Sequence, residues 1–196
     1  MFSGIVAEVG RVAAVARKGG ATRFAVEAPR IAPALEAGTS VAVNGVCQTV
    51  TDIRGAAFGF DSVAETLRST NLSSLAVGSV VNLEVALRLT DRISGHLVSG
   101  HVDGTCVVRA RRSVGSANCD FAVQMPADLS KYVRDKGSVC LDGVSLTVKA
   151  VRGSMLEVAV IPFTLENTII RDWRVGSVVN IEVDQIAKYL TPRQAK

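Results

Sequence analysis

The chain has 196 residues, and its 22 Lys and Arg against 18 Asp and Glu leave a formal net charge of only +4. The basic residues are scattered, and the densest cluster, Arg109 with Arg111 and Arg112, is too small to form a nucleic-acid footprint. No apolar run reaches the ~18 residues that span a bilayer, and the first residues do not show a basic stretch followed by an apolar one. We therefore expect a cytoplasmic protein with neither a nucleic-acid partner nor a membrane partner.

The sequence contains an internal repeat. Residues 40–50, SVAVNGVCQTV, match residues 138–148, SVCLDGVSLTV, at six of eleven positions. Residues 78–85, GSVVNLEV, match residues 176–183, GSVVNIEV, at seven of eight, and both pairs are 98 residues apart. An offset of half the chain is typical of a tandem repeat. We expect one domain over residues 1–97, a second over residues 98–184, and a C-terminal helix and tail over residues 185–196.

Alternating apolar residues predict short strands, in chain order, over residues 5–9, 23–26, 40–43 and 80–85. Asn44-Gly45 and Asp142-Gly143 are dipeptides that favour tight hairpins. Short helices are predicted over residues 31–36 and 64–67, and at the matching positions 127–135 and 164–167. A last helix over residues 184–190 is expected to begin with Asp184 as its N-cap and to end at Pro192.

Many short strands in each half favour a small closed barrel, because closure removes exposed strand edges. The predicted fold class is therefore all-β, with two tandem barrels, short helices and a C-terminal helix. The junction near residues 92–98 has no Pro- or Ser-rich linker, so we expect the two barrels to pack closely.

The two histidines of the chain occur together, in Ser94-Gly95-His96 and Ser99-Gly100-His101. One interpretation is a strand that crosses between the barrels, which would place the two rings on opposite faces and disfavour a metal site. His101 occupies the place that Ile5 has in the first copy, and a titratable ring in place of an aliphatic side chain favours a specific function. The four cysteines show no metal-ligand spacing, so we expect free thiols and no metal.

Cys47 and Ser145 follow the two hairpins at equivalent positions. Each alone is most simply a small residue in a barrel wall. Together with Thr49 and Thr147 on symmetry-related strands, they are also suited to donate hydrogen bonds to two similar polar heterocycles, one in each barrel. Lys136, near the second hairpin, is either a solvated side chain or part of that pocket. No Ser-His-Asp order, phosphate loop or pair of catalytic carboxylates is evident.

The ordered set of motifs MFSGIV, SVAVNGVCQTVT, FDSVAETLRSTNL, GHLVSGHVDG, DGVSLTV and IPFTLENT resembles the α-type riboflavin synthases, a family of lumazine-binding tandem barrels. The resemblance implies two six-stranded Greek-key barrels and a C-terminal helix that helps to form a homotrimer, and it allows an association with lumazine synthase. It also implies a transferase that needs no cofactor or metal. In the final step of riboflavin biosynthesis, two molecules of 6,7-dimethyl-8-ribityllumazine dismutate by four-carbon transfer to riboflavin and 5-amino-6-ribitylaminouracil.

The resemblance also implies two substrate pockets, which meet where the N-terminal barrel of one subunit faces the C-terminal barrel of its neighbour. The first is expected to contain Gly4, Ile5, Val6, Ser40, Cys47, Gln48, Thr49, Asp61, Ser62, Val63, Ala64, Glu65 and Thr66. The second is expected to contain Gly100, His101, Val102, Lys136, Ser145, Leu146, Thr147, Ile161, Pro162, Phe163, Thr164, Leu165 and Glu166. Supporting roles are expected for His96 at the junction and for the carboxylates Asp142 and Asp184.

Three residues are the expected catalytic groups. We expect His101 to shuttle the methyl proton of the lumazine, because that methyl group is acidic and a modest base suffices. Ser145 is expected to activate or supply the nucleophile that adds to the ring, and Cys47 to polarise or add to the partner ring.

The chain departs from the family pattern at Ser94, where Gly is usual, at Val85, where Arg is common, and at Phe163, where His or Glu is usual. The C-terminal helix is also short. Two other functions are compatible with such barrels: a lumazine-binding antenna protein without catalysis, and a purely structural tandem barrel that binds another protein. The presence of His101 and Thr147 favours the enzyme.

Overall fold

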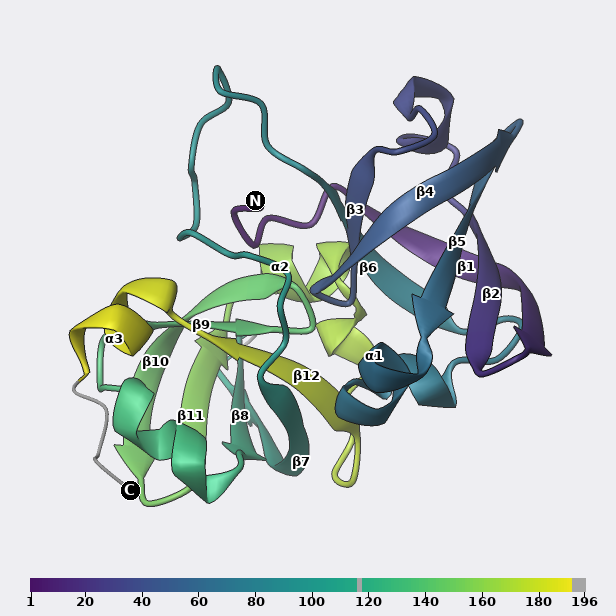
Figure 1. Ribbon diagram of the computed structural model, residues 1–196. Coiled ribbons are helices and arrows are strands. Elements are labelled where there is room, and N and C mark those ends of the chain that lie inside the picture. Colours follow the sequence, from purple (N-terminus) through teal and green to yellow (C-terminus); the bar gives the residue numbers. More distant parts are fainter. Residues whose placement is uncertain (116–117, 192–196) are drawn as a thin grey trace.

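The computed structural model describes residues 1–115 and 118–191, with the backbone alone at Lys18. Two barrels lie side by side, joined by a long segment that projects from the body of the molecule between β6 and β7 (Figure 1). Both barrels are closed and all of their strand pairs are antiparallel. Within these ranges, no helix is both long enough and apolar enough to cross a bilayer.

The N-terminal barrel has the strand order β1-β2-β5-β4-β3-β6. Its strands are β1 (Glu8–Lys18), β2 (Ala21–Glu27), β3 (Ser40–Val43), β4 (Val46–Arg54), β5 (Ala57–Val63) and β6 (Val80–Val85). Because β6 returns beside β3 after the β3-β4-β5 meander, the arrangement is a Greek key. The short helices are η1 (Ala32–Ala34), α1 (Ala64–Ser69) and η2 (Asn71–Ser74).

The C-terminal barrel repeats this topology in the order β10-β11-β8-β7-β12-β9. Its strands are β7 (Gly104–Val114), β8 (Asn118–Gln124), β9 (Ser138–Leu141), β10 (Val144–Arg152), β11 (Met155–Val160) and β12 (Val178–Val183). Its helices are η3 (Ala127–Tyr132), α2 (Pro162–Asn167), η4 (Ile169–Asp172) and α3 (Gln185–Leu190). The predicted fold class of two six-stranded Greek-key barrels is confirmed.

Most of the predicted elements are present. The strands at 40–43 and 80–85 coincide with β3 and β6, and Asp184 caps α3 by accepting a hydrogen bond from the Ile186 amide at 2.9 Å. All four cysteines are free thiols. Pro192, which was expected to end α3, lies outside the described residues.

Two local predictions are wrong. The first strand begins at Glu8, so Ile5 and Val6 precede it. The segment with the two histidines is not a strand that crosses between barrels: residues 86–103 are irregular apart from one bridge between Phe2 and Val98. The reason is that this segment pairs with the N-terminal residues instead of with a sheet.

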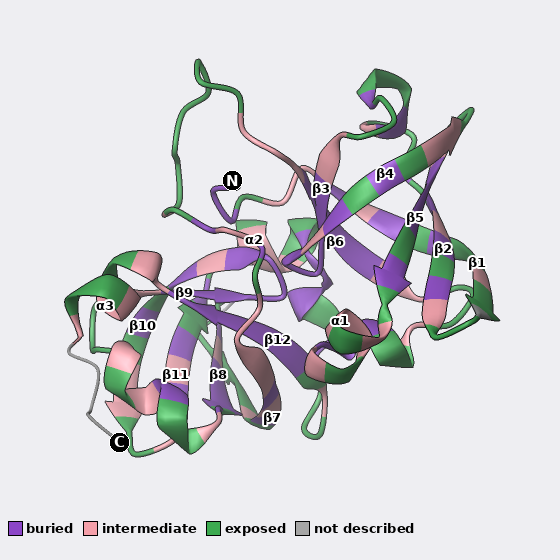
Figure 2. Ribbon diagram, viewed as in Figure 1, coloured by how far each residue is buried: buried purple, intermediate pink, exposed green. Residues whose placement is uncertain are grey.

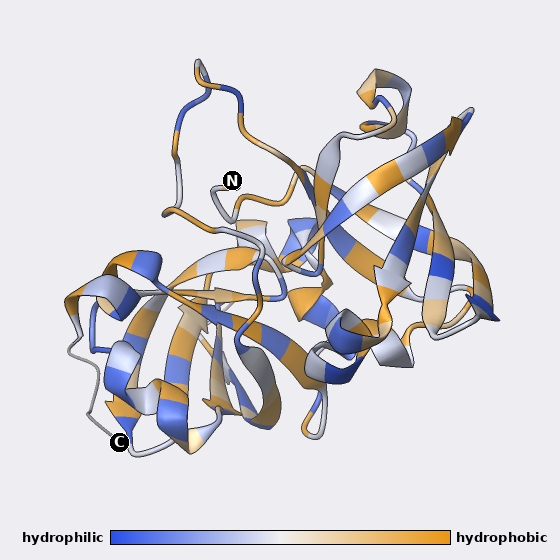
Figure 3. Cartoon of the chain, viewed as in Figure 1, coloured by the Kyte–Doolittle hydropathy of each residue, from blue (hydrophilic) through white to orange (hydrophobic). Residues whose placement is uncertain are grey.

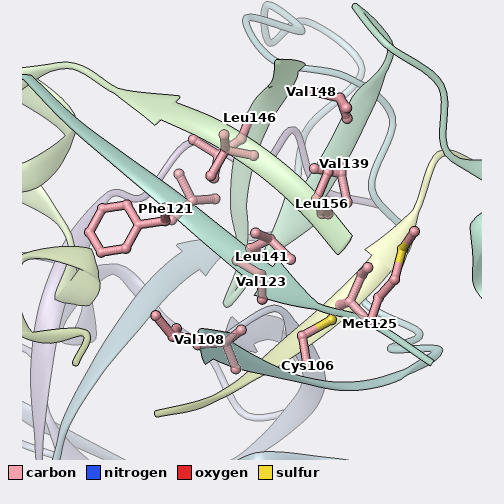
Figure 4. Packing of buried hydrophobic residues seen from close by; sticks show 14 of the residues in the cluster. Cys106, Val108, Phe121, Val123, Met125, Val139, Leu141, Leu146, Val148 and Leu156 are labelled. Atoms are coloured by element: carbon pink, nitrogen blue, oxygen red, sulfur yellow. The ribbon is translucent and has the colours of Figure 1, made fainter. Parts of the chain in front are cut away.

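Each barrel has its own hydrophobic core, so the inward-facing positions of the strands are buried and the outward-facing positions are exposed (Figure 2). Phe24, Phe58 and Phe60 lie in the core of the first barrel. In the second barrel the Phe121 ring lies at the end of the cluster away from Cys106 (Figure 4). Each fully buried large side chain contributes about 1.5–3 kcal/mol, which explains why each half folds around its own centre.

The barrels meet through a reciprocal set of buried hydrogen bonds. The side chain of Asn82 in β6 donates to the carbonyl of Asp142 at 2.8 Å and accepts from the amide of Ile169 at 2.9 Å, both in the other barrel. Asn180 in β12 makes the same two bonds in the opposite direction. The two hairpin turns touch at Gly45 and Gly143. The repeat therefore continues into the interface as an approximate two-fold arrangement, and the expectation of closely packed barrels is met.

Asp142 is the ionisable exception in this interface. It accepts hydrogen bonds from the Asn71 side chain, the Trp173 indole and the Asn180 amide at 2.8–3.1 Å. Complete burial raises its pKa to about 7, and these hydrogen bonds oppose that shift. Its counterpart in the first barrel is the neutral side chain of Asn44.

Candidate active site

In each barrel, two neighbouring strands stop pairing part of the way along their length. In the first barrel the β4–β5 ladder ends at Val50 and Phe60. Before that point, residues 47–49 of β4 pair with β3, and beyond it residues 61–63 of β5 pair with β2. The two strand ends therefore diverge, with Cys47 and Thr49 on one side and Asp61 on the other. We call this place, where β4 and β5 diverge, the first mouth.

The second barrel diverges at the same place. Its β10–β11 ladder ends at Val148 and Val158. Residues 145–147 then pair with β9, whereas Ala159 and Val160 pair with β8. Ser145 and Thr147 thus lie in a second mouth, at the positions that Cys47 and Thr49 occupy in the first.

The segment that leads into each barrel is held by a buried glutamate of the last strand. Glu84 in β6 accepts hydrogen bonds from the amide and hydroxyl of Ser3 and from the amide of Gly4, at 2.7–3.0 Å. Glu182 in β12 accepts the same three bonds from Ser99 and Gly100 at 2.7–2.9 Å. Burial raises the pKa of Glu84, and its hydrogen bonds with Ser3 and Gly4 oppose that shift.

These leading segments cross to the opposite barrel. The carbonyl of Gly4 accepts a hydrogen bond from the amide of Ser145 in the second mouth, and the carbonyl of Gly100 accepts one from the amide of Cys47 in the first, each at 2.8 Å. Both glycines have a left-handed φ, 75° and 81°, and a Cβ at either would collide with the strand that it approaches. Glycine is required there by the backbone conformation and by the close contact.

The exchange corrects the expected grouping of residues. Val6 packs against the core of the second barrel, and Val102 against the core of the first. Gly4, Ile5 and Val6 therefore belong with Ser145, and the segment of His101 belongs with Cys47. The expected grouping assumed that each leading segment serves the barrel it enters, whereas it contacts the other barrel before its own first strand begins.

His96 lies against Ser145 in the second mouth. Its Nδ1 atom is 2.7 Å from Ser145 Oγ, and its backbone amide donates to the Ser3 carbonyl at 3.1 Å. Burial lowers the pKa of His96, against the opposing effect of Asp184 and Glu182. A neutral imidazole can accept the hydroxyl proton of Ser145. The Nε2 atom of His96 is buried without a hydrogen-bond partner among the described residues.

His101 is exposed, and its amide donates to the Ser99 hydroxyl at 3.1 Å. It lines a cavity of about 500 Å³ together with Met1, Leu97, Ser99, Gln185, Ile186, Tyr189 and Leu190. The imidazole therefore lies between the first mouth and α3. In a single chain, Ser145 contacts His96, and the leading segment of His101 contacts Cys47.

Most of the remaining residues expected in the first mouth are polar. Asp61 pairs with Arg23 at 2.9 Å and Glu65 pairs with Arg68. Gln48 is buried and donates to the Cys47 carbonyl at 2.7 Å. The hydroxyl of Ser62 is buried and has no hydrogen-bond partner among the described residues, and Ser62 faces the barrel interior while Asp61 is exposed. Ser40 pairs with Thr49 across β3 and β4, and Val63, Ala64 and Thr66 lie at the start of α1.

The second mouth is more apolar. Phe163 is 71% exposed and Ile161 is 56% exposed, at the positions of Glu65 and Val63 in the first copy. Pro162 begins α2, which also contains Thr164 and Glu166, while Leu165 and Leu146 contact the core. The two mouths therefore have the same arrangement of strands but different exposed side chains.

Lys136 stands beside the second mouth in a strained conformation. Its φ is 65°, and its amide donates to the Val148 carbonyl at 2.9 Å. The equivalent residue of the first copy is Gly38, with φ 91°. A left-handed φ costs a side chain about 1–2 kcal/mol, and such strain is found preferentially where a side chain is functional.

The buried cysteines are poor nucleophiles. Burial raises the pKa of the Cys106 thiol to about 12 and that of Cys140 well above its usual value. Cys47 is only half-buried. Among residues 1–115 and 118–191, no cluster of three or more His, Cys, Asp or Glu side chains is placed to hold a metal ion.

Sequence reasoning missed the residues that hold the mouths together. Glu84, Glu182, Asn82 and Asn180 are buried polar side chains that bond across segments far apart in the sequence. The signal was present in GSVVNLEV and GSVVNIEV, where Asn and Glu are identical in both copies. A polar pair repeated within an apolar strand indicates a shared structural task.

The comparisons with known proteins agree with this duplicated site. The family model of the lumazine binding domain matches residues 3–86 and again residues 99–184. A tandem pair of lumazine binding domains is therefore the class of protein that the fold and the two mouths define.

Curated relatives narrow the class. The chain is 43% identical over 195 residues to the riboflavin synthase of Mycobacterium tuberculosis. The alignment covers 97% of this chain and 96% of that protein. It is 41% identical over 191 residues to the riboflavin synthase of Photobacterium phosphoreum, with 97% and 87% covered. The chain belongs to the riboflavin synthase family.

Solved structures support the same fold. A crystal structure of LumP complexed with flavin mononucleotide superposes with a TM-score of 0.83 at 25% identity, covering 93% of this chain and 99% of that chain. LumP complexed with 6,7-dimethyl-8-(1'-D-ribityl) lumazine superposes with a TM-score of 0.85 at 24% identity, over the same shares. The identity to LumP is well below the identity to the curated riboflavin synthases.

Proposed function

We propose that this chain is a riboflavin synthase: it catalyses the dismutation of two molecules of 6,7-dimethyl-8-ribityllumazine to riboflavin and 5-amino-6-ribitylaminouracil. The observation that supports this most directly is the pair of equivalent but unequal mouths. A reaction of one compound with itself needs two sites of similar shape, and a transfer between the two molecules needs those sites to differ.

The frame of each mouth suits a polar ring. Strand ends that diverge present backbone groups and the Thr49 or Thr147 hydroxyl on either side of the opening. In the first mouth, the exposed carboxylates of Asp61 and Glu65 suit the ribityl chain of one substrate. In the second, Lys136 offers a cation to the ring carbonyls, and Phe163 replaces the carboxylate.

Each mouth has one imidazole. His101, carried by the segment that contacts Cys47, takes and returns the acidic methyl proton of the substrate. His96 orients the Ser145 hydroxyl and accepts its proton when Ser145 activates or supplies the nucleophile. Cys47 polarises or adds to the partner ring. Proton transfer by a positioned side chain typically contributes 10²–10⁴-fold, and a neutral His96 suits that task.

The larger part of the rate comes from bringing two substrates together. Well-oriented reactants gain about 7–11 kcal/mol from proximity. We propose that a homotrimer supplies this, with the first mouth of one subunit against the second mouth of its neighbour. A single chain leaves Leu89, Tyr189 and Leu190 at least 78% exposed, on the projecting segment and α3, where apolar residues lie on the surface (Figure 3). Association with lumazine synthase and a cytoplasmic location stay predictions.

Purified chain incubated with 6,7-dimethyl-8-ribityllumazine tests the proposal. We expect two molecules of substrate to disappear for each riboflavin and each pyrimidine formed, followed by absorbance in the flavin band and by chromatography. A stoichiometric spectral shift without product would indicate an antenna protein, and no change would indicate a structural one. Sedimentation of wild type and Tyr189→Asp tests the assembly: a wild-type chain that sediments as a monomer while active would refute the trimer.

A further inference from the structure

A hollow of about 410 Å³ lies in the N-terminal barrel. It is bounded by residues of the β1–β2 hairpin, of α1 and of η2, which are labelled or can be followed by colour in Figure 1, and none of the residues expected in the first mouth lines it. Its lining is mostly apolar and includes Val15, Thr22, Phe24, Leu72 and Leu75. Its volume is within the range of small-molecule sites.

In the second barrel, the equivalent position contains the side chain of Trp173. Phe24 and Phe121 are equivalent, since Val15 pairs with Phe24 and Arg111 pairs with Phe121 in the same register. Leu75 ends η2 as Trp173 ends η4, 98 residues later. In the second barrel the indole of Trp173 is 4% exposed and packs edge-on against Phe121, with ring centroids 5.4 Å apart at 84°.

Arg111 covers the Phe121 ring in the second barrel and holds the main chain of Trp173. Its guanidinium lies 5.7 Å from the Phe121 ring centroid, and its Nη1 atom donates to the carbonyls of Arg171 and Trp173 at 3.0 Å. In the first barrel the equivalent side chains are Val15 and Leu75, which are shorter and leave the hollow. The two barrels therefore have the same backbone arrangement here. The second barrel fills the place with its own Trp173, and the first barrel does not fill it.

We propose that the hollow of the N-terminal barrel binds a planar aromatic molecule of the size of indole. The repeat supplies the template, because an indole occupies the same frame in the other half of the same chain. Phe24 stacks on Phe60 with ring centroids 5.2 Å apart and is 1% exposed, so only the edge that borders the hollow can meet a ligand. Thr22 replaces Cys119 at this end of the barrel and adds a hydroxyl to the lining, and Arg17 lies at the rim.

Indole itself is the probe. Saturation-transfer NMR of indole with the full chain, together with ¹³C methyl shifts of Leu67 and Leu72, measures the binding. We expect saturable shifts at these methyl groups in wild type. Leu75→Trp supplies the plug of the second barrel, so it is expected to weaken indole binding about tenfold or more and to raise Tm by about 2–4 °C. Val77→Trp places an indole two residues away on an exposed site and is expected to change neither.

Three results would overturn the proposal. The first is no saturable shift in wild type, and the second is unchanged binding in Leu75→Trp. The third is displacement of indole by 6,7-dimethyl-8-ribityllumazine, because the probe would then occupy a mouth. These results do not depend on turnover of the lumazine. The hollow can therefore fail as a binding site while the proposed dismutation stands, and the dismutation can fail while the hollow still binds indole.

Discussion

The two barrels are alike where they hold each other and different where a ligand would lie. Glu84 and Glu182 make the same three hydrogen bonds, and Asn82 and Asn180 cross the interface in the same way. At the mouths, by contrast, Cys47 faces one opening and Ser145 the other. An interface between two copies of one fold works when both sides keep the same residues. A transfer between two identical molecules needs the sites to diverge.

The exchange of leading segments connects the interface between the barrels with the two mouths. Because Gly4 reaches Ser145 and Gly100 reaches Cys47, each mouth depends on a glutamate of the other barrel. Four changes test this comparison, and they follow from the largest expected effect to the smallest.

The largest effect is expected when the imidazole of the first mouth is replaced by its counterpart from the other copy. His101→Ile removes the proton shuttle but keeps an exposed side chain of the kind found at Ile5. We expect turnover of the lumazine to fall by about 10²–10⁴-fold, measured as riboflavin formed per minute. Arg92→Ala, exposed on the same segment, is the control. Full activity of His101→Ile would remove the shuttle role.

The anchoring glutamates are expected to act on stability and across barrels. Glu84→Ala leaves buried donors of Ser3 and Gly4 unpaired, so the free energy of unfolding should fall by about 2–4 kcal/mol in urea denaturation. The exchange predicts a second result: hydrogen exchange should accelerate at the Ser145 amide in Glu84→Ala and at the Cys47 amide in Glu182→Ala. Acceleration confined to the barrel of the mutated residue would contradict the crossing.

Asp142 is expected to make stability depend on pH, where Asn44 does not. Its pKa is raised to about 7 in the folded chain, against about 3.9 in unfolded chains. The folded state therefore holds the extra proton between these values, and the free energy of unfolding should fall as pH rises through this window and level off above it. Between pH 5 and pH 8 we expect wild type to lose about 2–3 kcal/mol relative to Asp142→Asn. Parallel pH profiles of the two proteins would refute this.

The smallest effect is expected at Lys136. Lys136→Gly relieves a left-handed φ and should raise the free energy of unfolding by about 0.5–1 kcal/mol, seen in denaturant unfolding. If Lys136 contacts substrate, KM for the lumazine should rise in the same variant. The mirror change Gly38→Lys should lower stability without affecting the second mouth. A variant that gains no stability would show that the backbone is not strained.

Local features predicted much of the fold. Alternation in residues 40–43 and 80–85, together with the Asn44-Gly45 and Asp142-Gly143 turns, predicted strands and hairpins correctly, because these signals act between neighbours in the sequence. The pairing of Cys47 with Ser145 as equivalent positions also followed from the repeat. The contact of His96 with Ser145 could not be predicted in this way, because the two residues are 49 positions apart and local sequence patterns do not indicate such a contact.

The sequence by itself determined that this protein has two copies of one barrel with different side chains at Cys47 and Ser145, because the two halves can be aligned with each other and the turn dipeptides are local signals. Only the tertiary structure decided which barrel each leading segment serves. Gly4-Ile5-Val6 and Gly100-His101-Val102 have equivalent patterns, so either partner is compatible with them. The choice follows from the closed interface, in which each glutamate holds its own segment while the segment's carbonyl meets the opposite strand.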